Sequence, residues 1–531
     1  MILRLADLPS ALRAAAALTL AAVALAAGGG RAEPGRDPAA AQDRAPWDLT
    51  LFHTNDAHGA FLPAPAAWRD DRAPVGGVVA LGACLARERR AAPVSLLLDA
   101  GDFMTGNPIC DIEVDGARGG GWQDLLGLLG YDAGVIGNHE FDHGRANALA
   151  LAARSLFPLL ADDILDERGE PLLRPGPLVI ERAGLRIGII GVSCAGLFAV
   201  TSPARTGGLS LRDQERVVRE QLARLIETTD VQLLISHSGF DDDKRLAARL
   251  AGSGLDVIIG GHSHTRLTKP AVAGADIPIV VQAGSHLRQL GRLDLRIEAG
   301  RVVGHQWRAI ELLAAGATDD APDTLVAAAA HWEERIRQEF GRVIATLASD
   351  WRDSGRQESN VGSWIADALR ARARADVAFV NSGSIRRDQP AGPLTALDVK
   401  EILPFENTLV TFELTGEQLR RIALNNARLA AHRGGILQIS GLTYAWREVG
   451  DHVEVEDVRV AGEPARDGRV YRAAAPDYVC LQAKDYLAMD PPTTRYAGVT
   501  VTDAVLEAAA AAGTIDARVE GRMRQRVAQG R

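Results

Sequence analysis

Five short polar motifs, spread over about 210 residues, constrain the fold of this chain more than any other feature. Each motif directly follows an apolar run and supplies aspartate, asparagine or histidine. Because loops at the carboxyl ends of strands usually carry the site of an α/β domain, we expect the motifs to meet at one sheet edge. The motifs are Asp56-Ala57-His58, Gly101-Asp102, Gly137-Asn138-His139-Glu140, Ser236-His237-Ser238 and Gly261-His262-Ser263-His264.

The apolar runs have the length of short buried strands, and segments with helical spacing separate them. This alternation predicts an α/β layered domain over the first two thirds of the chain. We expect helices such as 77–90 and 213–227. The expected strands are 49–53, 94–98, 133–136, 185–192, 231–235 and 257–259.

A chain of 531 residues is too long for one ordinary core, so we expect a second domain. Residues 321–340 are Ala-rich and charged with helical spacing, which indicates an interdomain helix. A helix at 361–373 and strands at 377–380 and 409–414 then indicate an α+β unit. The expected divisions are a leader at 1–46, a first domain at 47–315, an interdomain helix at 316–344 and a second domain at 345–525.

The N-terminus is typical of an export signal. Arg4 and Arg13 precede the apolar stretch 14–27, which has the length of a signal-peptide core and is too short to span a bilayer comfortably. We expect an exported protein, periplasmic or secreted, without stable membrane insertion after signal cleavage. An Ala-rich tail without an export role is the alternative.

Charge and cysteine content exclude some classes of protein. The net charge of -9 argues against a nucleic-acid binder, whereas two bound divalent cations would reverse the local charge at an anion site. Cys84, Cys110, Cys194 and Cys480 form no CxxC pair, so a structural zinc site is not expected. A Cys84–Cys110 disulfide and buried free thiols both stay open.

The motifs together provide ligands for two metal ions. Asp56 and His58, two apart at a strand end, would project to one side of an extended chain, and His262 and His264 have the same spacing. The Asp102 carboxylate could bridge two ions. Oxygen and imidazole ligands without thiolate suit Zn, Mn, Fe, Co or Ni. Each motif alone has an ordinary interpretation as a turn, a helix cap or a buried histidine, and only the ordered set favours metal binding.

His139 is expected to act differently from the ligands. Asp142 lies three residues further on, so both side chains would share a face if Asn138 opened a helix. A carboxylate beside an imidazole fixes its tautomer and favours the protonated form. We therefore expect His139 to stabilise phosphoryl oxygens and protonate a leaving group. A surface ion pair is the alternative, and Glu140 is expected to orient the loop.

These motifs resemble the calcineurin-like metallophosphoesterases, in particular the 5'-nucleotidase family. The resemblance rests on the stretches 51–59, 101–102, 137–142, 236–237 and 260–264. It implies a four-layer metallophosphoesterase sandwich domain and a catalytic dyad of His139 and Asp142. The implied ligands of metal 1 are Asp56, His58, Asp102 and His264, and those of metal 2 are Asp102, Asn138, His237 and His262.

The C-terminal region is similar to the α+β 5'-nucleotidase C-terminal domain at 381–386, 403–407, 438–441 and 476–478. The resemblance implies that Phe405 and Tyr478 sandwich a base, Arg386 binds phosphate or ribose, and Asn381 and Asp485 bind base or sugar. The chain departs from the family pattern at Ser382, Ser384, Ala483 and Lys484, where the family has glycine. Without the resemblance, core packing would be the ordinary role of both aromatic side chains.

Together these observations predict an exported, dinuclear metal-dependent phosphohydrolase of nucleotide catabolism, which attacks nucleotide esters with a metal-bound hydroxide. The expected cofactors are two divalent ions (Mn, Zn, Fe or Co), and the expected partner is a small phosphate ester. A 2',3'-cyclic-nucleotide phosphodiesterase, a UDP-sugar hydrolase and a thiosulfohydrolase-type enzyme are alternatives. A non-catalytic exported nucleotide-binding protein is an alternative of another class.

Overall fold

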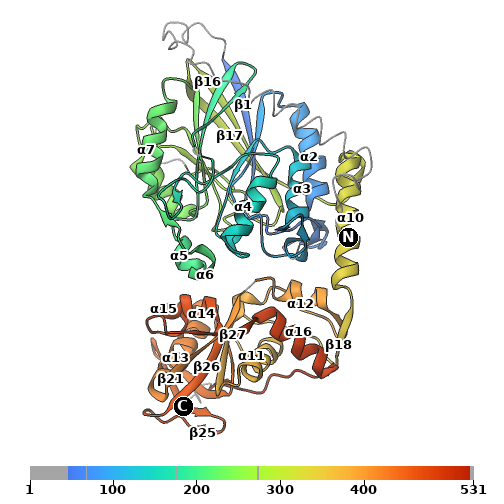
Figure 1. Cartoon of the computed structure of the whole chain (residues 1–531), viewed down its shortest axis with the longest axis vertical. Coiled ribbons are helices and arrows are strands. Elements are labelled where there is room, and N and C mark those ends of the chain that lie inside the picture. The colour runs from blue at the N-terminus through green and yellow to red at the C-terminus, as the bar shows by residue number, and fades with distance from the viewer. Residues whose placement is uncertain are drawn as a thin grey trace. The chain divides into compact units, whose positions relative to one another are not determined.

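The chain divides into two compact units inside the long helix α10 (Asp323–Phe340) (Figure 1). The first unit ends at Glu333, and the second begins at Glu334 and also includes residues 106–108. The structure is a computed structural model, and the predicted export signal lies outside its described residues. The described residues are 46–526 except 67, 175, 272, 273, 275 and 406.

Two sheets form the centre of the first unit. In the first sheet the neighbours of β1 are parallel β4 and antiparallel β16, whereas in the second sheet β11, β13, β14 and β15 run parallel. The first sheet has the order β17 (Arg301–Glu311), β16 (Gln289–Glu298), β1 (Trp47–Thr54), β4 (Ser95–Asp99), β7 (Ala133–Val135) and β8 (Leu159–Leu160). The second has the order β10 (Leu178–Arg182), β11 (Leu185–Val192), β13 (Val231–Ser236), β14 (Val257–Gly260) and β15 (Ile279–Val281).

The two sheets pack face to face, and helices cover their outer faces. Alternate residues of β1 and β4, such as Leu51 and Leu98, join Ile189, Leu233 and Ile259 of the second sheet in one buried cluster. Helix α7 (Gln214–Leu225) buries one side of its amphipathic surface against the other face of the second sheet. Figure 1 shows α2 (Val78–Arg90) and α3 (Gly120–Leu129) on the side opposite α7. The four-layer sandwich implied by the family resemblance is confirmed.

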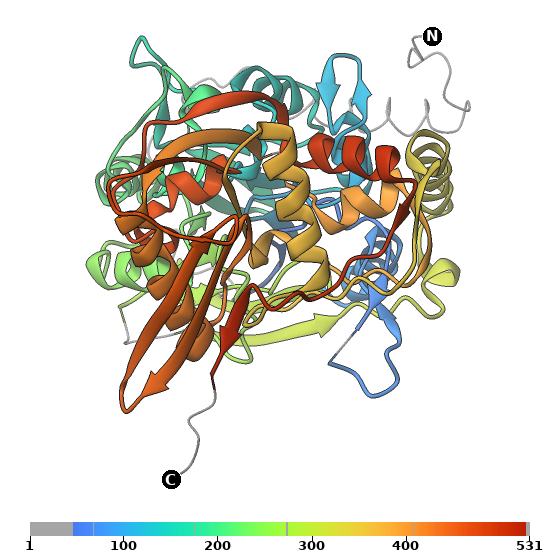
Figure 2. The same cartoon turned by 90° about the horizontal axis from the view of Figure 1, so that it is seen from below.

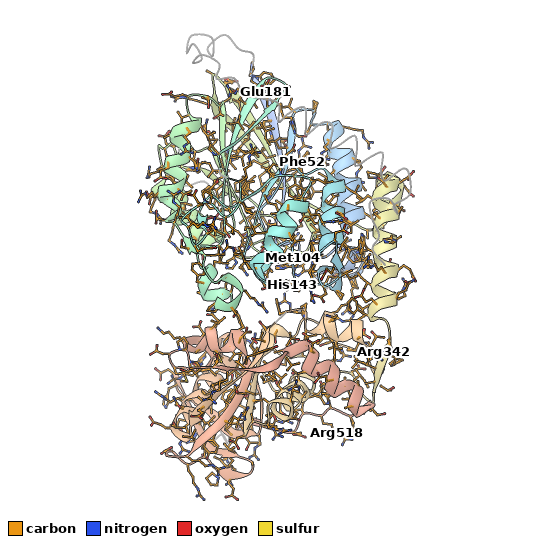
Figure 3. The ribbon with its side chains drawn as sticks, in the orientation of Figure 1. Phe52, Met104, His143, Glu181, Arg342 and Arg518 are labelled. Atoms are coloured by element: carbon orange, nitrogen blue, oxygen red, sulfur yellow. The ribbon has the colours of Figure 1, made fainter. Side chains whose placement is uncertain are left out.

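This sheet arrangement places the strand-end loops together. Strands β1, β4 and β7 are parallel neighbours in one sheet, and β13 and β14 are parallel neighbours in the other. Within each sheet, the loops that follow these strands therefore emerge at the same edge, at the carboxyl ends of the strands. Figure 3 shows Met104, just after β4, and His143, after β7, toward one end of the unit, and Glu181 of β10 at the other. The expected strands differ from the observed ones by at most two residues at either end, and the strand expected at 185–192 matches β11 at both ends.

The second unit is built around a five-stranded sheet with helices packed on it. Helix α11 (Asn360–Ala373) and helix α16 (Val501–Ala512) share one buried cluster with this sheet, and α13 (Gly416–Arg428) packs in another. The hairpin of β23 (Leu442–Val449) and β24 (His452–Val460) lies at the edge of the unit (Figure 2). The central sheet has the order β22 (Leu437–Ser440), β19 (Val377–Asn381), β26 (Val470–Pro476), β21 (Thr408–Thr415) and β27 (Arg495–Thr500).

Two further sequence expectations concern the described residues. All four cysteines are buried and free, so the Cys84–Cys110 disulfide that the sequence left open does not form. Among residues 46–526, apart from the gaps given above, no helix has both the length and the apolar character needed to cross a membrane.

Candidate metal centre

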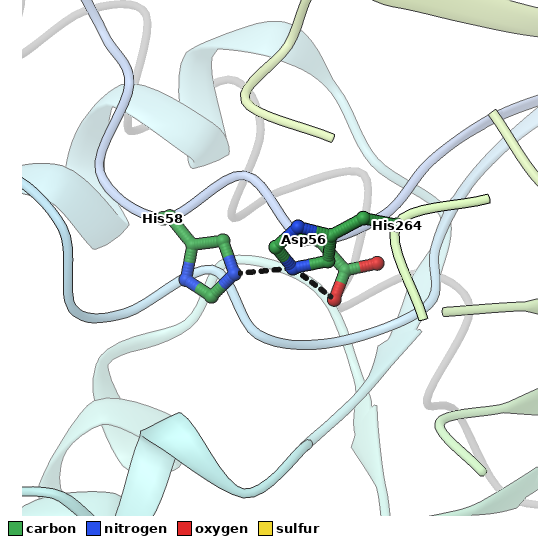
Figure 4. A group of neighbouring side chains, drawn as sticks. All are labelled: Asp56, His58 and His264. Carbon is green, nitrogen blue, oxygen red and sulfur yellow. Dashed lines mark hydrogen bonds and ion pairs between the residues drawn. The ribbon is translucent and has the colours of Figure 1, made fainter. Parts of the chain in front are cut away.

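Two groups of side chains converge at the carboxyl ends of β1, β4, β13 and β14. Asp56, His58 and His264 form the first group (Figure 4), and Asp102, His237 and His262 form the second. The groups are adjacent, because Asp56 Oδ1 lies 4.0 Å from His237 Nε2. Two ligand groups this close together suit a pair of ions side by side, as in dinuclear hydrolytic sites.

The distances inside each group match those between ligands of one ion. The Nε2 atoms of His58 and His264 lie 3.0 Å apart, and His264 Nε2 lies 3.5 Å from Asp56 Oδ1. Two nitrogen ligands at about 2.1 Å from one ion are about 3.0–3.4 Å apart, depending on geometry. In the second group, His237 Nε2 lies 2.9 Å from Asp102 Oδ2.

Backbone carbonyls fix the tautomers of two of these histidines. His58 Nδ1 donates to the carbonyls of Met104 and Thr105 at 3.1 and 2.9 Å, and His237 Nδ1 donates to Ala100 O at 2.6 Å. A carbonyl only accepts hydrogen bonds, so each Nδ1 must carry the ring proton. The unprotonated Nε2 of each ring can then bind a metal ion. Such outer contacts are typical of metal-binding histidines.

The ligand loops have left-handed backbone conformations. Asp56, His58, Asp102, His262 and His264 have φ of 51, 49, 55, 70 and 53°. Non-glycine residues rarely adopt this region, and such strain concentrates at functional sites. The extended conformation expected for Asp56 and His58 is therefore wrong. The two side chains meet because each lies in a tight, hydrogen-bonded loop: Asp56 N donates to Gly101 O and His58 N to Asp102 O.

Asn138 and Gly137 follow β7, and Gly137 lies against Asp102 and His237 of the second group. The Asn138 Oδ1 atom is buried without a hydrogen-bond partner, and His237 Nε2 also lacks one of acceptable geometry although Asp102 is near. Unpartnered buried polar atoms beside a carboxylate suit a bound cation. A Cβ on Gly137 would lie 2.2 Å from Asp102 Oδ1, so only glycine fits there. The residues present therefore fit two divalent ions.

The charges of the site also favour cations. Burial raises the pKa of Asp56 to about 8, and the nearby Asp102 contributes to the rise, although His237 opposes it. Burial lowers the pKa of His58 to about 3, which keeps this imidazole neutral, as a metal ligand must be. Burial alone would lower the pKa of His237, but Asp102 reverses this effect and raises it to about 10. A divalent ion bound at His237 would replace the proton that this raised pKa favours.

His139 and Asp142 form the pair expected from their spacing. His139 Nδ1 lies 2.7 Å from Asp142 Oδ2, although Asn138 opens only one turn of 3₁₀ helix, η4 (His139–Phe141), rather than an α-helix. Burial lowers the pKa of His139, but Asp142 and Asp102 more than offset this and raise it to about 9. The His139 backbone N–H donates to Asp102 Oδ1 at 2.9 Å, which ties the pair to the second group.

Glu140 connects the loops and belongs to neither ligand group. Its carboxylate accepts hydrogen bonds from the backbone N–H groups of Asp102, Met104 and Gly137 at 3.1, 3.0 and 2.5 Å. Burial raises its pKa to about 7. Since these bonds join the loops after β4 and β7, Glu140 fixes the positions of Asp102 and Asn138 relative to each other.

In the second unit, each of the five predicted substrate-binding residues is aromatic or lies near an aromatic side chain of that unit. The guanidinium of Arg386 lies 5.7 Å from the centre of the Phe405 ring. Tyr478 lies beside Tyr486, with ring centres 6.3 Å apart, and Asp485 is near enough to raise the pKa of Tyr478, after burial as the main cause. Asn381 hydrogen-bonds the Tyr486 side chain.

Several residues around these sites were not predicted from the sequence. Asn55 donates to Asp56 Oδ2 at 2.6 Å, and the ring of His286 lies 5.2 and 5.6 Å from those of His58 and His264. Tyr486 bonds Asn381, and Thr105 and Arg205 both bond Asp142. Asn55 could have been found from its place directly before the first motif. The others have no local signal.

Family models match both units. A calcineurin-like phosphoesterase model matches residues 49–266, and a model of the 5'-nucleotidase C-terminal domain matches residues 341–490, together more than half of the chain. The chain belongs to the 5'-nucleotidase family of calcineurin-like phosphoesterases. It is therefore a hydrolase by family and fold, with two candidate metal-binding groups in its phosphoesterase unit.

Curated relatives and a solved structure agree with this family. A 5'-nucleotidase of Vibrio vulnificus is 27% identical over 484 residues, which cover 81% of this chain and 84% of the relative. A 5'-nucleotidase of Bos taurus is 28% identical over 494 residues, covering 82% and 83%. The crystal structure of a 5'-nucleotidase precursor from Thermus thermophilus has a TM-score of 0.72 at 26% identity, covering 90% of this chain and 99% of that one.

Proposed function

We propose that this protein is an exported, dinuclear metal-dependent phosphohydrolase that cleaves nucleotide phosphate esters. The observation that carries the proposal is the pair of adjacent ligand groups, 4.0 Å apart at Asp56 and His237, beside the His139–Asp142 dyad. Relatives named 5'-nucleotidase support the nucleotide part of the proposal. The proposed divisions are a leader at 1–46 and domains at 47–315 and 345–525, joined by residues 316–344.

Two divalent ions would activate a water molecule and neutralise charge on the phosphoryl oxygens. Asp102 is the proposed shared ligand, because its Oδ2 lies 2.9 Å from His237 Nε2 and its charge also acts on Asp56 and His58 of the first group. The oxygen and imidazole donor set suits Mn, Zn, Fe or Co. The proposed ligands are Asp56, His58, Asp102 and His264 for one ion, and Asp102, Asn138, His237 and His262 for the other.

His139 is the proposed proton donor to the leaving oxygen. Its Nδ1 is engaged by Asp142 at 2.7 Å, so Nε2 is the atom that can face substrate. Asp142 stays ionised: burial would raise its pKa, but His139 and Arg205 hold it below its usual value. A proton held on Nε2 can therefore pass to the ester oxygen as the bond to phosphorus breaks.

The second unit is the proposed nucleotide-binding domain. Phe405 and Tyr478 would stack on the base, Arg386 would bind phosphate or ribose oxygens, and Asn381 and Asp485 would bind base or sugar. The side chains of Phe405 and Tyr478 are only partly buried, which leaves ring surface for a ligand and supports this assignment over core packing. Arg386 is exposed, so its charge is available to an anionic ligand.

A substrate panel tests the proposal on protein loaded with manganese or zinc. We expect phosphate release from AMP to exceed the hydrolysis of 2',3'-cyclic AMP, UDP-glucose and a protein-bound thiosulfonate. Faster cleavage of one of the other three would assign the chain to that alternative. Stoichiometric AMP binding without phosphate release would identify a non-catalytic nucleotide-binding protein. Uptake of one metal equivalent or fewer, or full activity after exhaustive chelation, would refute the dinuclear mechanism.

A further inference from the structure

Thr105, just after β4, contacts both parts of the site in the first unit. Its carbonyl oxygen accepts a hydrogen bond from His58 Nδ1 at 2.9 Å, and its hydroxyl donates to Asp142 Oδ2 at 2.7 Å. The residue is 3% exposed, so bulk water does not compete for these bonds. One residue therefore joins the first ligand group to the carboxylate that holds His139.

The backbone of Thr105 is strained. Its φ of 62° lies in the left-handed region, which a β-branched residue rarely adopts. The preceding residue, Met104, fixes the segment further, because its N–H donates to Glu140 Oε1 at 3.0 Å and its carbonyl accepts from His58 Nδ1. Strain of this kind persists only where the surroundings over-determine it, and it concentrates at functional sites.

Arg205 contacts the other oxygen of the same carboxylate. Its Nη1 atom lies 3.2 Å from Asp142 Oδ1, and the two side chains are 17% and 11% exposed. Arg205 lies on α6 (Pro203–Thr206), 63 residues after Asp142. His139 and Thr105 on Oδ2 and Arg205 on Oδ1 thus hold the Asp142 carboxylate from both sides.

We propose that Thr105 is a positioning residue that sets the His139–Asp142 dyad at a fixed distance from the first ligand group, with Arg205 as the second anchor of Asp142. The inference rests on the proposed function of the dyad. Proton donation to a leaving oxygen requires the imidazole within hydrogen-bond reach of it while the phosphoryl group is held at the ligand groups. A rigid link between the two parts maintains that geometry.

The first experiment compares two esters of different leaving groups in the full-length, metal-loaded protein. The alcohol released from AMP needs a proton, whereas the p-nitrophenolate released from p-nitrophenyl phosphate does not. Thr105→Val removes the hydroxyl and keeps the branched shape. We expect kcat for AMP to fall about tenfold, the effect of one hydrogen bond to a charged group. The KM for AMP, the metal content and kcat for p-nitrophenyl phosphate should change little.

Two further variants complete this comparison. Thr105→Ser keeps the hydroxyl and should restore the native ratio of the two kcat values. Thr50→Val is the matched control, because Thr50 Oγ1, in the middle of β1, also donates to a carboxylate, Asp294 Oδ1, at 2.6 Å. Equal losses on both esters, or a loss of metal with Thr105→Val, would show a structural role and overturn the inference.

The second experiment uses non-additivity. In a His139→Ala background, Thr105→Val and Arg205→Gln should cause no further loss with AMP, because both act through the dyad. Additive losses would overturn the inference. Arg205→Gln acts on Asp142 from outside the strained segment, so it tests the inference even if Thr105→Val does not fold. If His139→Ala itself keeps the native ratio for the two esters, the proposed role of His139 fails instead.

Discussion

Replacing Gly137 by alanine should disable the second ligand group. The added Cβ would lie 2.2 Å from Asp102 Oδ1 and 2.7 Å from His237 Nε2, whereas real Cβ atoms essentially never approach other atoms within 3.0 Å. Asp102, His237 or the loop must therefore move by about 1 Å, a misplacement that costs about 100-fold in rate. We expect kcat/KM for AMP to fall by about this factor, together with weaker binding of one metal equivalent.

The assay combines phosphate release with metal titration at several manganese concentrations. Gly196→Ala is the matched control, because no atom lies within 4 Å of its added Cβ and its φ is -94°. The control should keep native turnover and native metal stoichiometry. Two metal equivalents bound at native affinity, with near-native turnover, in Gly137→Ala would refute the reasoning, because the ligands would then tolerate the displacement.

Three other predictions concern the bridging role of Asp102, the pH dependence of protein stability at Asp256, and base stacking on Phe405. Asp102→Asn should lower activity by several orders of magnitude without unfolding, and near-normal turnover would refute the bridging role. Burial raises the pKa of Asp256 from 3.8 to about 6, so its stabilising contribution is complete below 3.8 and is lost as pH rises through 6. Asp256→Asn should therefore melt higher than the native protein at pH 7 and show no such advantage at pH 3.5; a pH-independent difference would contradict this. Phe405→Ala should raise the KM for AMP about 5–150-fold, since a stacked base contributes about 1–3 kcal/mol, and should leave ribose 5-phosphate hydrolysis unchanged. Equal effects on both substrates would argue for core packing.

The fold was predictable because its strands are local features of the sequence. Apolar runs such as 185–192 and 257–259 are long enough to identify buried strands without knowledge of their neighbours, and the observed strands β11 and β14 match them within one residue. The four-layer order followed from the family resemblance. The side-by-side pairing of β1 with β4 and of β13 with β14 depends on contacts distant in sequence.

The site was predictable in its residue types but not in its geometry. Spacing suggested that Asp56 and His58 would project from an extended chain, yet both lie in left-handed loops. The same spacing in His262 and His264 places these two side chains in different groups. A two-residue spacing does not specify the turn between the residues, because that turn depends on hydrogen bonds to other loops, such as those from Asp56 N–H to Gly101 and from His262 N–H to Asp56.

The sequence by itself determined which chemical groups are present and in what order they leave the strands, because ligand identity and strand length are encoded locally. Only the tertiary structure decided how the loops meet. In the tertiary structure Arg205 contacts Asp142 across 63 residues of sequence, and the strained residue Thr105 contacts both His58 and Asp142. These contacts depend on where two sheets bring separate loops together, and no spacing within one segment encodes that position.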